Sequence, residues 1–542
     1  MKGKSAVMTT VTSIRDLFAA KALADIPKIL TLQDRNRHSP THGCFDRNHW
    51  HYKIIDFPCG MSQEFVYPLA LVYALDLPDN PWRGQEALRQ WVRAGIGFAA
   101  ASAHADGSCD DYYPFEKALG AAAFTLLAFA ESMLLLGLDD DDLLRFVEKR
   151  AVWLAQRQES GQLSNHQALV ALGLAKSAEL LGTERFETAI EERVRQLLAW
   201  RRAEGWFPEY DGCDPGYLTL TIAYLADLDR LRPGLGLREP LRQAIDFVAQ
   251  LMHPDGTLGG EYCSRNTYNY FPHGFELAGR WHPPALDLNT RFARALRGGL
   301  EACHGDDHIL GHHVINYLLT WRDFVEQRPE PGPRPQGRLW FAEAGLLVER
   351  RSGYELYAGL NKGGAFKLFK DDALAISDSQ LSVVERRGKK ARNAVGHMCG
   401  DYDLELSDDA ISVAGHLSWA KQSLMTTTRL LILRLGMLSV GRLAPDLVRR
   451  VLQRLLIVGR RESPHRFRRV FRFADGGWTI TDELNCPDWS AVERVAIGCD
   501  QTSIYIAMSR TYQQGQLQEW LELIPGQPRP ADGQALRLER RL

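Results

Sequence analysis

The stretch "SNHQALVALGLAKSAELLG", residues 164–182, opens with three polar residues and continues as a run rich in Ala and Leu. Its apolar residues recur at spacings of three and four, which is typical of an amphipathic helix. The same spacing recurs from about residue 62 to 326, so this part of the chain is predicted to be a succession of helices. Further examples are residues 63–75, 84–103, 114–137, 141–158, 185–203 and 216–231.

Glycine-containing breaks separate these helices at similar distances. Gly107, Gly161, Gly205 and Gly256 are 54, 44 and 51 residues apart. A period of about fifty residues with two helices per period is typical of stacked helical hairpins. Each break is then expected on the same rim of the stack. Periodicity alone does not show whether the stack closes into an α/α toroid, whose rim loops would converge on one groove.

The pattern of apolar residues changes after "EQRPEPGPRPQGRLW", residues 326–340. The four prolines of this segment predict a stiff, extended linker. Short alternating runs follow and indicate an antiparallel β-sandwich, interrupted by one predicted helix at 444–458. The predicted domains are a helical domain over 1–325, the linker, and a sandwich over 341–542. The runs taken as strands include 345–351, 354–360, 410–420, 426–442, 467–484 and 502–508.

The composition is that of an ordinary globular protein, with 45% hydrophobic and 24% charged residues. The net charge of -2 offers no global argument for a nucleic acid or a membrane surface as a partner. Nine cysteines without a CxxC pair indicate free thiols rather than a disulfide framework or a zinc site. We expect neither a metal nor a cofactor.

The sequence also bears on location. It has no run of about 18 uncharged apolar residues, so no membrane span is predicted. The first thirty residues contain Arg15, Asp16 and Lys21 and lack the apolar core of a secretory signal. A cytoplasmic location is therefore the expectation, and the oligomeric state is left open.

Ser164, Asn165 and His166 stand at the start of one predicted helix, close to the break at Gly161. Ser164 or Asn165 can cap this helix, because both side chains accept hydrogen bonds from free N–H groups. A neutral imidazole near the positive end of a helix has a lowered pKa, which suits His166 as a base at neutral pH. The polar trio alone does not decide between these interpretations.

A second rim loop, within residues 204–228, combines aromatic side chains with carboxylates. This mixture suits a sugar-binding cleft, because pyranose rings present apolar C–H faces and hydroxyl edges. The alternative is a packed loop with an Asp-Pro turn, since aromatic residues bury well wherever they lie. The candidate residues of this loop are Trp206, Glu209, Tyr210, Asp214 and Tyr217.

A third rim loop, residues 253–276, places an arginine among polar and aromatic residues. The planar guanidinium of Arg265 matches a carboxylate, although a lone Arg is usually a surface residue. Asn266, Tyr268 and His273 are candidate substrate contacts in the same loop. The earlier loop 104–118 adds Tyr113, with Asp106, Asp110, Asp111, Tyr112 and Glu116 around it.

Asn, His, Tyr and Arg on successive rim loops suit one reaction, the removal of the C5 proton of a uronic acid. The proton becomes more acidic when an amide, Arg or His neutralises the adjacent carboxylate, as preorganised donors do for any developing oxyanion. A phenol or imidazole then takes the proton, and Tyr can return one to the leaving oxygen. Tyr normally titrates near 10, so cationic neighbours have to lower the pKa of Tyr217 for it to act as a base.

Four segments resemble the toroid domain of heparinase II/III-like proteins, which are often encoded beside bacterial exopolysaccharide genes. They are 106–131, 164–175, "GWFPEYDGCDPGYLTLTIAYLADL" at 205–228 and "EYCSRNTYNYFPHGFE" at 261–276. The resemblance implies an α/α toroid, as an incomplete barrel of helical hairpins, followed by a β-sandwich. It also implies a polysaccharide lyase that acts by β-elimination on an anionic, uronate-containing substrate.

Carried over by motif, Asn165 neutralises the carboxylate, His166 is the base or a neutraliser, and Tyr217 is the acid and base. Arg265 is a looser match, as a second carboxylate contact. Sandwich domains of this superfamily often add a catalytic His and sometimes a metal, but the segment 361–403 lacks a clear His-x-His-x-Asp cluster. His397 is the candidate His, with His416 as an alternative, and no metal is predicted.

Other functions use the same features. A C5-epimerase begins with the same proton abstraction, and a polysaccharide-binding protein needs the groove without chemistry. A glycoside hydrolase requires two carboxylates across the scissile bond, and Asp106, Asp110, Asp111, Asp214 and Asp255 are candidates. Twelve arginines between 429 and 472 form either a solvated face or a track for a polyanion. No recognised nucleic-acid motif accompanies them, so nucleic acid is not predicted as a partner.

Overall fold

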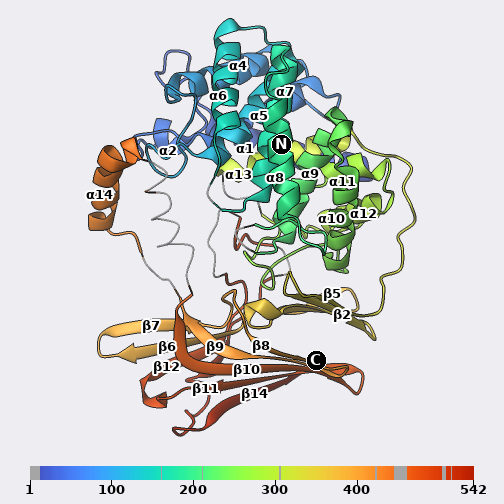
Figure 1. Ribbon diagram of the computed structural model, residues 1–542, viewed down its shortest axis with the longest axis vertical. Coiled ribbons are helices and arrows are strands. Elements are labelled where there is room, and N and C mark those ends of the chain that lie inside the picture. Colours follow the sequence, from blue (N-terminus) through green and yellow to red (C-terminus); the bar gives the residue numbers. More distant parts are fainter. Residues whose placement is uncertain are drawn as a thin grey trace, which may run out of the picture.

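The computed structural model describes residues 13–159, 161–209, 212–303, 307–420, 424–444, 448, 460–502, 508–513 and 516–542. A helical region ends at Arg322, and the strands begin at Gly337 (Figure 1). The helices lie above two antiparallel sheets in this view. This is the predicted architecture, an α/α toroid followed by a β-sandwich. All nine cysteines are free.

The inner helices of the toroid form a ring in which each contacts the next. The last helix of the ring also contacts the first, so the inner ring closes. The ring consists of α3 (Val66–Ala74), α5 (Leu119–Leu136), α7 (Ser164–Leu181), α9 (Pro215–Leu231), α11 (His273–Gly279) and α13 (Asp307–Arg322), with η1 (Met61–Phe65) leading into α3.

The outer helices pack around this ring and expose one face each. In α10, the buried residues include Leu241, Ile245 and Val248, which recur at helical spacing. The inner helices α5 and α7 are buried nearly all round, because they pack against neighbours on every side. The outer layer consists of α1 (Ile14–Leu32), α4 (Glu86–Ser102), α6 (Asp141–Gln156), α8 (Glu187–Trp200), α10 (Arg238–Leu251) and α12 (Pro284–Arg297), with α2 (Arg47–Trp50) and η2 (Pro233–Leu235) in connections.

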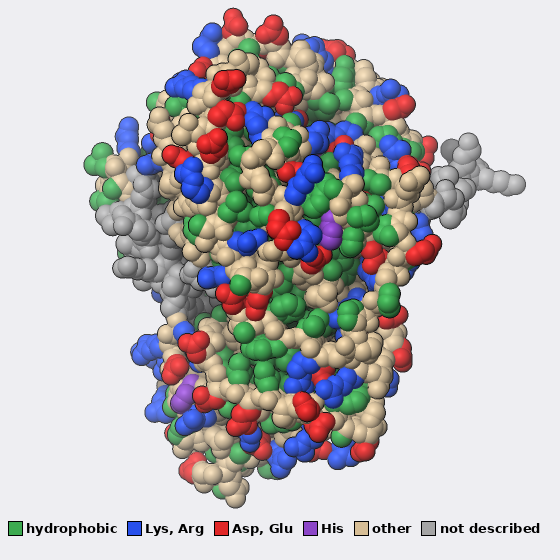
Figure 2. Space-filling view, turned by 45° about the vertical axis from the view of Figure 1, so that its right-hand side comes forward, with side chains coloured by type: hydrophobic (Ala, Val, Ile, Leu, Met, Phe, Trp, Pro, Cys, Tyr) green, Lys and Arg blue, Asp and Glu red, His purple; other side chains and the backbone are tan. Residues whose placement is uncertain are grey.

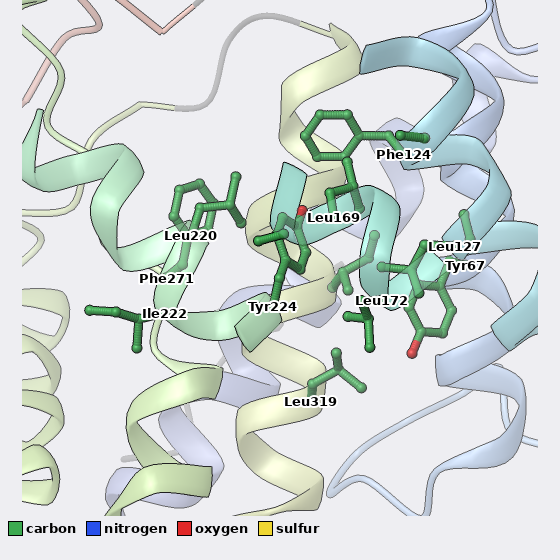
Figure 3. Packing of buried hydrophobic residues seen from close by; sticks show 14 of the residues in the cluster. Tyr67, Phe124, Leu127, Leu169, Leu172, Leu220, Ile222, Tyr224, Phe271 and Leu319 are labelled. Atoms are coloured by element: carbon green, nitrogen blue, oxygen red, sulfur yellow. The ribbon is translucent and has the colours of Figure 1, made fainter. Parts of the chain in front are cut away.

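Apolar side chains from the inner helices pack against one another inside the ring (Figure 3). Leu127 of α5, Leu172 of α7 and Leu319 of α13 belong to this core. Helix α5 is long and apolar enough to cross a membrane, and 83% of its 18 residues are buried within the protein. It escaped the sequence search because it contains Glu131, which pairs with Lys176 of α7 at 3.2 Å.

The glycines at the predicted breaks all have positive φ angles, between 85° and 101°. Gly256 shows why a side chain does not fit at such a turn. A Cβ at this position would lie 2.2 Å from the carbonyl oxygen of Arg291 on α12. The break after α10 is therefore a close approach of two backbones as well as a left-handed turn.

All neighbouring strands in the two sheets are antiparallel, as expected of a sandwich. The five-stranded sheet has the order β1-β2-β3-β4-β5, with β1 (Gly337–Phe341), β2 (Leu346–Arg351), β3 (Tyr354–Gly359), β4 (Ala365–Lys370) and β5 (Ala373–Asp378). The nine-stranded sheet has the order β13-β12-β6-β7-β9-β10-β11-β14, with β8 on β9. Its strands are β6 (Leu381–Arg387), β7 (Lys390–Val395), β8 (Asp403–Leu406), β9 (Ala410–Trp419), β10 (Glu462–Ala474), β11 (Gly477–Asn485), β12 (Val492–Ile497), β13 (Leu521–Ile524) and β14 (Ala535–Arg541).

The central strands of the five-stranded sheet, β2, β3 and β4, are buried on both faces. Leu346 and Val348 of β2 point into the core of the toroid, whereas Leu347 between them points into the core of the sandwich. This alternation follows from the two-residue period of a strand. The small sheet therefore joins the helical region to the large sheet.

One predicted strand is a helix. Residues 426–442 form α14 (Thr427–Gly436), which continues into the π-helix η4 (Met437–Gly441). Thr426 caps α14 by accepting a hydrogen bond from the Arg429 N–H. Of the other predicted elements in this half, the helix at 444–458 lies almost entirely outside the described residues, and so does most of the strand at 502–508.

The arginine-rich segment divides between two environments. Along β10, Arg466, Arg468 and Arg472 face outward in alternation with buried residues. Arg469 points inward, where it pairs with Asp378 at 2.8 Å and with Asp482 at 2.6 Å. The strand therefore presents a solvated arginine face, and Arg469 belongs to a buried ion network.

Candidate active site

Helix α11 begins inside the ring, beside Ala223 of α9, whereas α5, α7 and α9 begin together at one rim of the toroid. The loops that precede them contain nearly all predicted site residues of the helical region. The second rim loop, between α8 and α9, contacts the turn between β1 and β2, because Glu204 accepts hydrogen bonds from the N–H groups of Glu343 and Ala344. Helix N-termini carry partial positive charge. Their convergence at this rim favours an anionic ligand.

The second rim loop holds the start of α7. The carboxylate of Glu209 accepts hydrogen bonds from the Asn165 N–H at 2.7 Å and from Asn165 Nδ2 at 2.8 Å. Ser164 Oγ donates to the carbonyl oxygen of Pro208 at 2.6 Å. Neither Ser164 nor Asn165 caps its own helix. Glu209 satisfies the free N–H from another loop instead, so the capping interpretation was wrong.

Arg265 joins the second and third rim loops. Its Nε donates to Asp214 Oδ2 at 2.9 Å, and its Nη2 lies 3.5 Å from Glu209 Oε2. Its guanidinium carbon lies 4.2 Å from the centre of the Tyr217 ring. Asp214 is the N-cap of α9 and accepts from the Tyr217 N–H and from Thr267 Oγ1. Asn165, Tyr217 and Arg265 therefore meet around two buried carboxylates.

Exposure differs within this cluster. Asn165 and Arg265 are each 1% exposed and Glu209 is fully buried, whereas Tyr217 is half-buried. Burial raises the pKa of the Glu209 carboxyl, although Arg265 and the hydrogen bonds from Asn165 act in the opposite direction. Tyr217 is therefore the member of the cluster most open to a ligand.

His166 lies beside the cluster and has its own carboxylate partner. Its Nδ1 is 2.6 Å from Glu159 Oε2, and the Glu159 side chain is fully buried. The imidazole packs over α5, where a Cβ at Gly120 would lie 2.7 Å from its Cε1. A carboxylate on Nδ1 fixes the orientation of the ring and its tautomer. Sequence analysis missed Glu159, although it lies only seven residues before His166.

Several predicted contacts lie away from the cluster. His273 points into the ring interior, with Nε2 2.8 Å from Asp323 Oδ2, and lines a small cavity there. Trp206 is buried and donates from Nε1 to Glu204. Tyr113 is half-buried in the first rim loop. Tyr210 lies outside the described residues.

Tyr268 and Asn266 face the sandwich. Tyr268 donates from its hydroxyl to Glu261 Oε1 at 2.6 Å, and Glu261 also pairs with Lys367 of β4 at 3.6 Å. Asn266 donates from Nδ2 to the carbonyl oxygen of Gln501 at 3.1 Å. Burial and the charge of Glu261 raise the pKa of nearby Asp500 to about 6. These contacts hold the third rim loop against the β-domain.

His397 comes from the loop after β7 and is 4% exposed. Its Nδ1 lies 3.1 Å from the carbonyl oxygen of Ser379. Burial and the charge of Lys362 lower the pKa of His397 to about 3, so the ring is neutral at pH 7. The same loop reaches the third rim loop through Cys399 Sγ, which lies 3.7 Å from the carbonyl oxygen of Ser264.

The carboxylates proposed for a hydrolase are engaged in local structure. Asp110 accepts from the N–H groups of Phe115 and Lys117 and lies 2.8 Å from His104 Nε2. Asp106 pairs with Lys117 at 2.6 Å, and Asp214 belongs to the arginine cluster. Asp255 accepts from the N–H and hydroxyl groups of Thr257. Among the residues that the structure describes, His, Cys, Asp and Glu form no group suited to a metal ion.

The chain is similar to solved structures of polysaccharide lyases. A structure of Streptomyces coelicolor A3 chondroitin AC lyase with chondroitin sulphate aligns at a TM-score of 0.54 and 12% identity, over 91% of this chain and 69% of that chain. The fold is that of polysaccharide lyases. A structure of a Paenibacillus xanthan lyase also aligns with this chain, at a TM-score of 0.54 and 11% identity, over 90% of this chain and 47% of that chain.

This chain thus spans less than half the length of the xanthan lyase. No model of a protein family and no curated protein matches the sequence. At 11–12% identity this similarity shows the fold alone, so the reaction depends on which residues lie at the rim.

Proposed function

We propose that this protein is a polysaccharide lyase that cleaves a uronic-acid-containing glycan by β-elimination at the rim cluster. The observation that carries the proposal is the meeting of Asn165, Tyr217 and Arg265 around Glu209 and Asp214. The similar S. coelicolor enzyme was solved in complex with chondroitin sulphate, an anionic polysaccharide. The lyase fold and the helix N-termini at the rim support the same class of substrate.

The base in this proposal is the Tyr217 phenol. The guanidinium of Arg265 lies 4.2 Å from the ring centre, where a cation is attracted to the electron-rich face of the phenol and holds the ring in place. Tyr217 takes the C5 proton, the electron pair forms the C4–C5 double bond, and the C4–O bond breaks. The phenol then returns the proton to the leaving oxygen. The net change is one new double bond and two new chain ends, of which one is the unsaturated uronate and the other bears the protonated leaving oxygen, without water.

Asn165 has the role of neutralising the substrate carboxylate. Its Nδ2 already donates one hydrogen bond to Glu209, which holds the amide in place and leaves its second N–H for a ligand. Because Asn165 is 1% exposed, contact with a substrate requires the rim loops to separate locally. His166, oriented by Glu159, is the second candidate for this role or for the base. His397 stays a candidate for a contribution from the sandwich.

The proposal is tested by incubating the full chain with a panel of uronate polysaccharides, including chondroitin sulphate and xanthan. Ultraviolet absorbance reports the unsaturated product, and mass spectrometry identifies the new ends. We expect absorbance to rise with at least one polymer. Reducing ends without absorbance would identify a hydrolase, and deuterium uptake from solvent without cleavage would identify a C5-epimerase. Unchanged sugar that still binds would identify a binding protein.

A further inference from the structure

Helix α14 presents apolar side chains to solvent, whereas Arg434, one of its two arginines, faces the protein. Arg434 points inward, where its Nη2 lies 2.8 Å from Asp56 Oδ1 and its guanidinium lies 5.4 Å from the Phe57 ring. Leu431, Ile432 and Leu435 point outward and are 57%, 65% and 67% exposed. This orientation is the reverse of an ordinary surface helix, whose apolar face packs inward.

The exposed apolar surface continues on both sides of these residues. Half of the large hydrophobic side chains that are exposed among the described residues lie in the segment 424–444. Leu424 before the helix and Leu443 after it are 84% and 87% exposed. A contiguous apolar patch of this kind on a protein surface indicates an interaction site.

The charge of the segment is of one sign. Residues 424–444 contain Arg429, Arg434 and Arg442 and no Asp or Glu. Arg429 and Arg442 are exposed at the two ends of the apolar surface. Elsewhere, Figure 2 shows side chains of both charges interspersed over the visible face of the molecule. Within this segment the exposed apolar side chains are accompanied by arginines and by no acidic residue, which matches the boundary of an anionic lipid layer.

A neighbouring loop extends the same surface. It runs from α2 to Asp56, the partner of Arg434, and Figure 1 places α2 beside α14. Tyr52 and Ile54 in this loop are 58% and 74% exposed, with exposed Lys53 between them. Tyr and Lys suit a membrane boundary, because each combines an apolar body with a polar tip.

From these observations, we infer that the α14 surface, residues 424–444 with 52–54, docks the protein on an anionic membrane surface without crossing it. A second copy of the chain fits the surface less well, because a symmetric contact would bring arginines against arginines. An anionic polysaccharide would use the arginines but not the leucines. The inference does not depend on the proposed lyase reaction.

Flotation of the full chain with vesicles tests the inference. Vesicles of phosphatidylglycerol and phosphatidylcholine are compared with vesicles of phosphatidylcholine alone, at low and high salt. The wild-type protein should float with the anionic vesicles and far less with the neutral ones. The triple variant Leu431→Ser, Ile432→Ser, Leu435→Ser should bind the anionic vesicles at least about tenfold more weakly.

The matched control is Leu404→Ser with Leu406→Ser, which removes exposed leucines from β8. It should bind vesicles as the wild type does, and circular dichroism checks that every variant is folded. Absence of flotation by the wild type, or equal flotation by the triple variant, would overturn the inference. The inference would also be overturned if the wild type did not bind vesicles and sedimented as a dimer, and the triple variant sedimented as a monomer.

Discussion

At the scale of single residues, the rim depends on buried ionised groups that satisfy one another. Glu209 accepts two hydrogen bonds from Asn165 and lies beside Arg265, which also pairs with Asp214. Removing one member of such a group leaves the others buried without full compensation, which costs more than the pair itself contributes.

Glu209→Ala should therefore lower the free energy of unfolding by about 3 kcal/mol. Glu148→Ala, which removes an exposed partner of Arg185, should change it by less than about 1 kcal/mol. Urea denaturation of both variants measures the difference. Equal effects would mean that Glu209 does not organise the rim.

A second prediction at this scale concerns pH. The pKa of His397 is lowered from 6.5 to about 3, so the unfolded chain binds a proton at this site between these values and the folded chain does not. Stability should then fall as pH drops below about 6.5, by up to about 1.4 kcal/mol per pH unit from this residue. His397→Gln should have a shallower slope in urea titrations between pH 7 and 4. An unchanged slope would contradict the prediction, and exposed His38→Gln is the control.

Much of the cluster could be predicted at the residue scale, and its internal partners could not. Residue types suited to one reaction stand on successive loops, which is visible in the sequence. Glu209 binds Asn165, which is 44 residues away in the sequence, and only the folded structure shows that the two side chains are close. The sequence therefore supplied Glu209 as a sugar contact, whereas the structure places it as the residue that holds Asn165.

At the scale of elements, the breaks between helices are set by close backbone approaches. Gly256 and Gly236 both have positive φ, but only Gly256 lacks space for a Cβ. Gly236→Ala should lower the free energy of unfolding by about 1 kcal/mol, from backbone strain alone. Gly256→Ala should lower it by at least about 2 kcal/mol more, because α12 has to move to make room for the Cβ. Thermal unfolding measures both, and equal costs would show that the contact with α12 is unimportant.

The element that sequence analysis assigned wrongly was α14. Its segment mixes Leu, Ile and Thr with Arg, which suits a half-buried strand as well as a helix when the run is short. Leu and Arg are also strong helix formers, and Thr426 supplies a cap. The long helices of the toroid carried no such ambiguity, because their pattern extends over several turns.

At the scale of the whole molecule, the helical region and the sandwich share a core. Leu346, Val348, Tyr357 and Phe369 of the small sheet belong to the same apolar cluster as the helices. The two regions should therefore unfold in one calorimetric transition, and Phe369→Ala should lower the temperature of that whole transition. Two separated transitions, with only one of them moved by Phe369→Ala, would show that the regions are independent.

The lyase function is decided at the same scale, because the base and its cation come from different loops of the toroid. Tyr217→Phe removes the proposed base, and Tyr73→Phe is a matched control on α3. The decisive measurement is the initial rate of ultraviolet absorbance on the polymer that the wild type cleaves fastest. We predict a rate at least about a hundredfold lower for Tyr217→Phe and a wild-type rate for Tyr73→Phe. A wild-type rate for a folded Tyr217→Phe protein would contradict β-elimination at this rim.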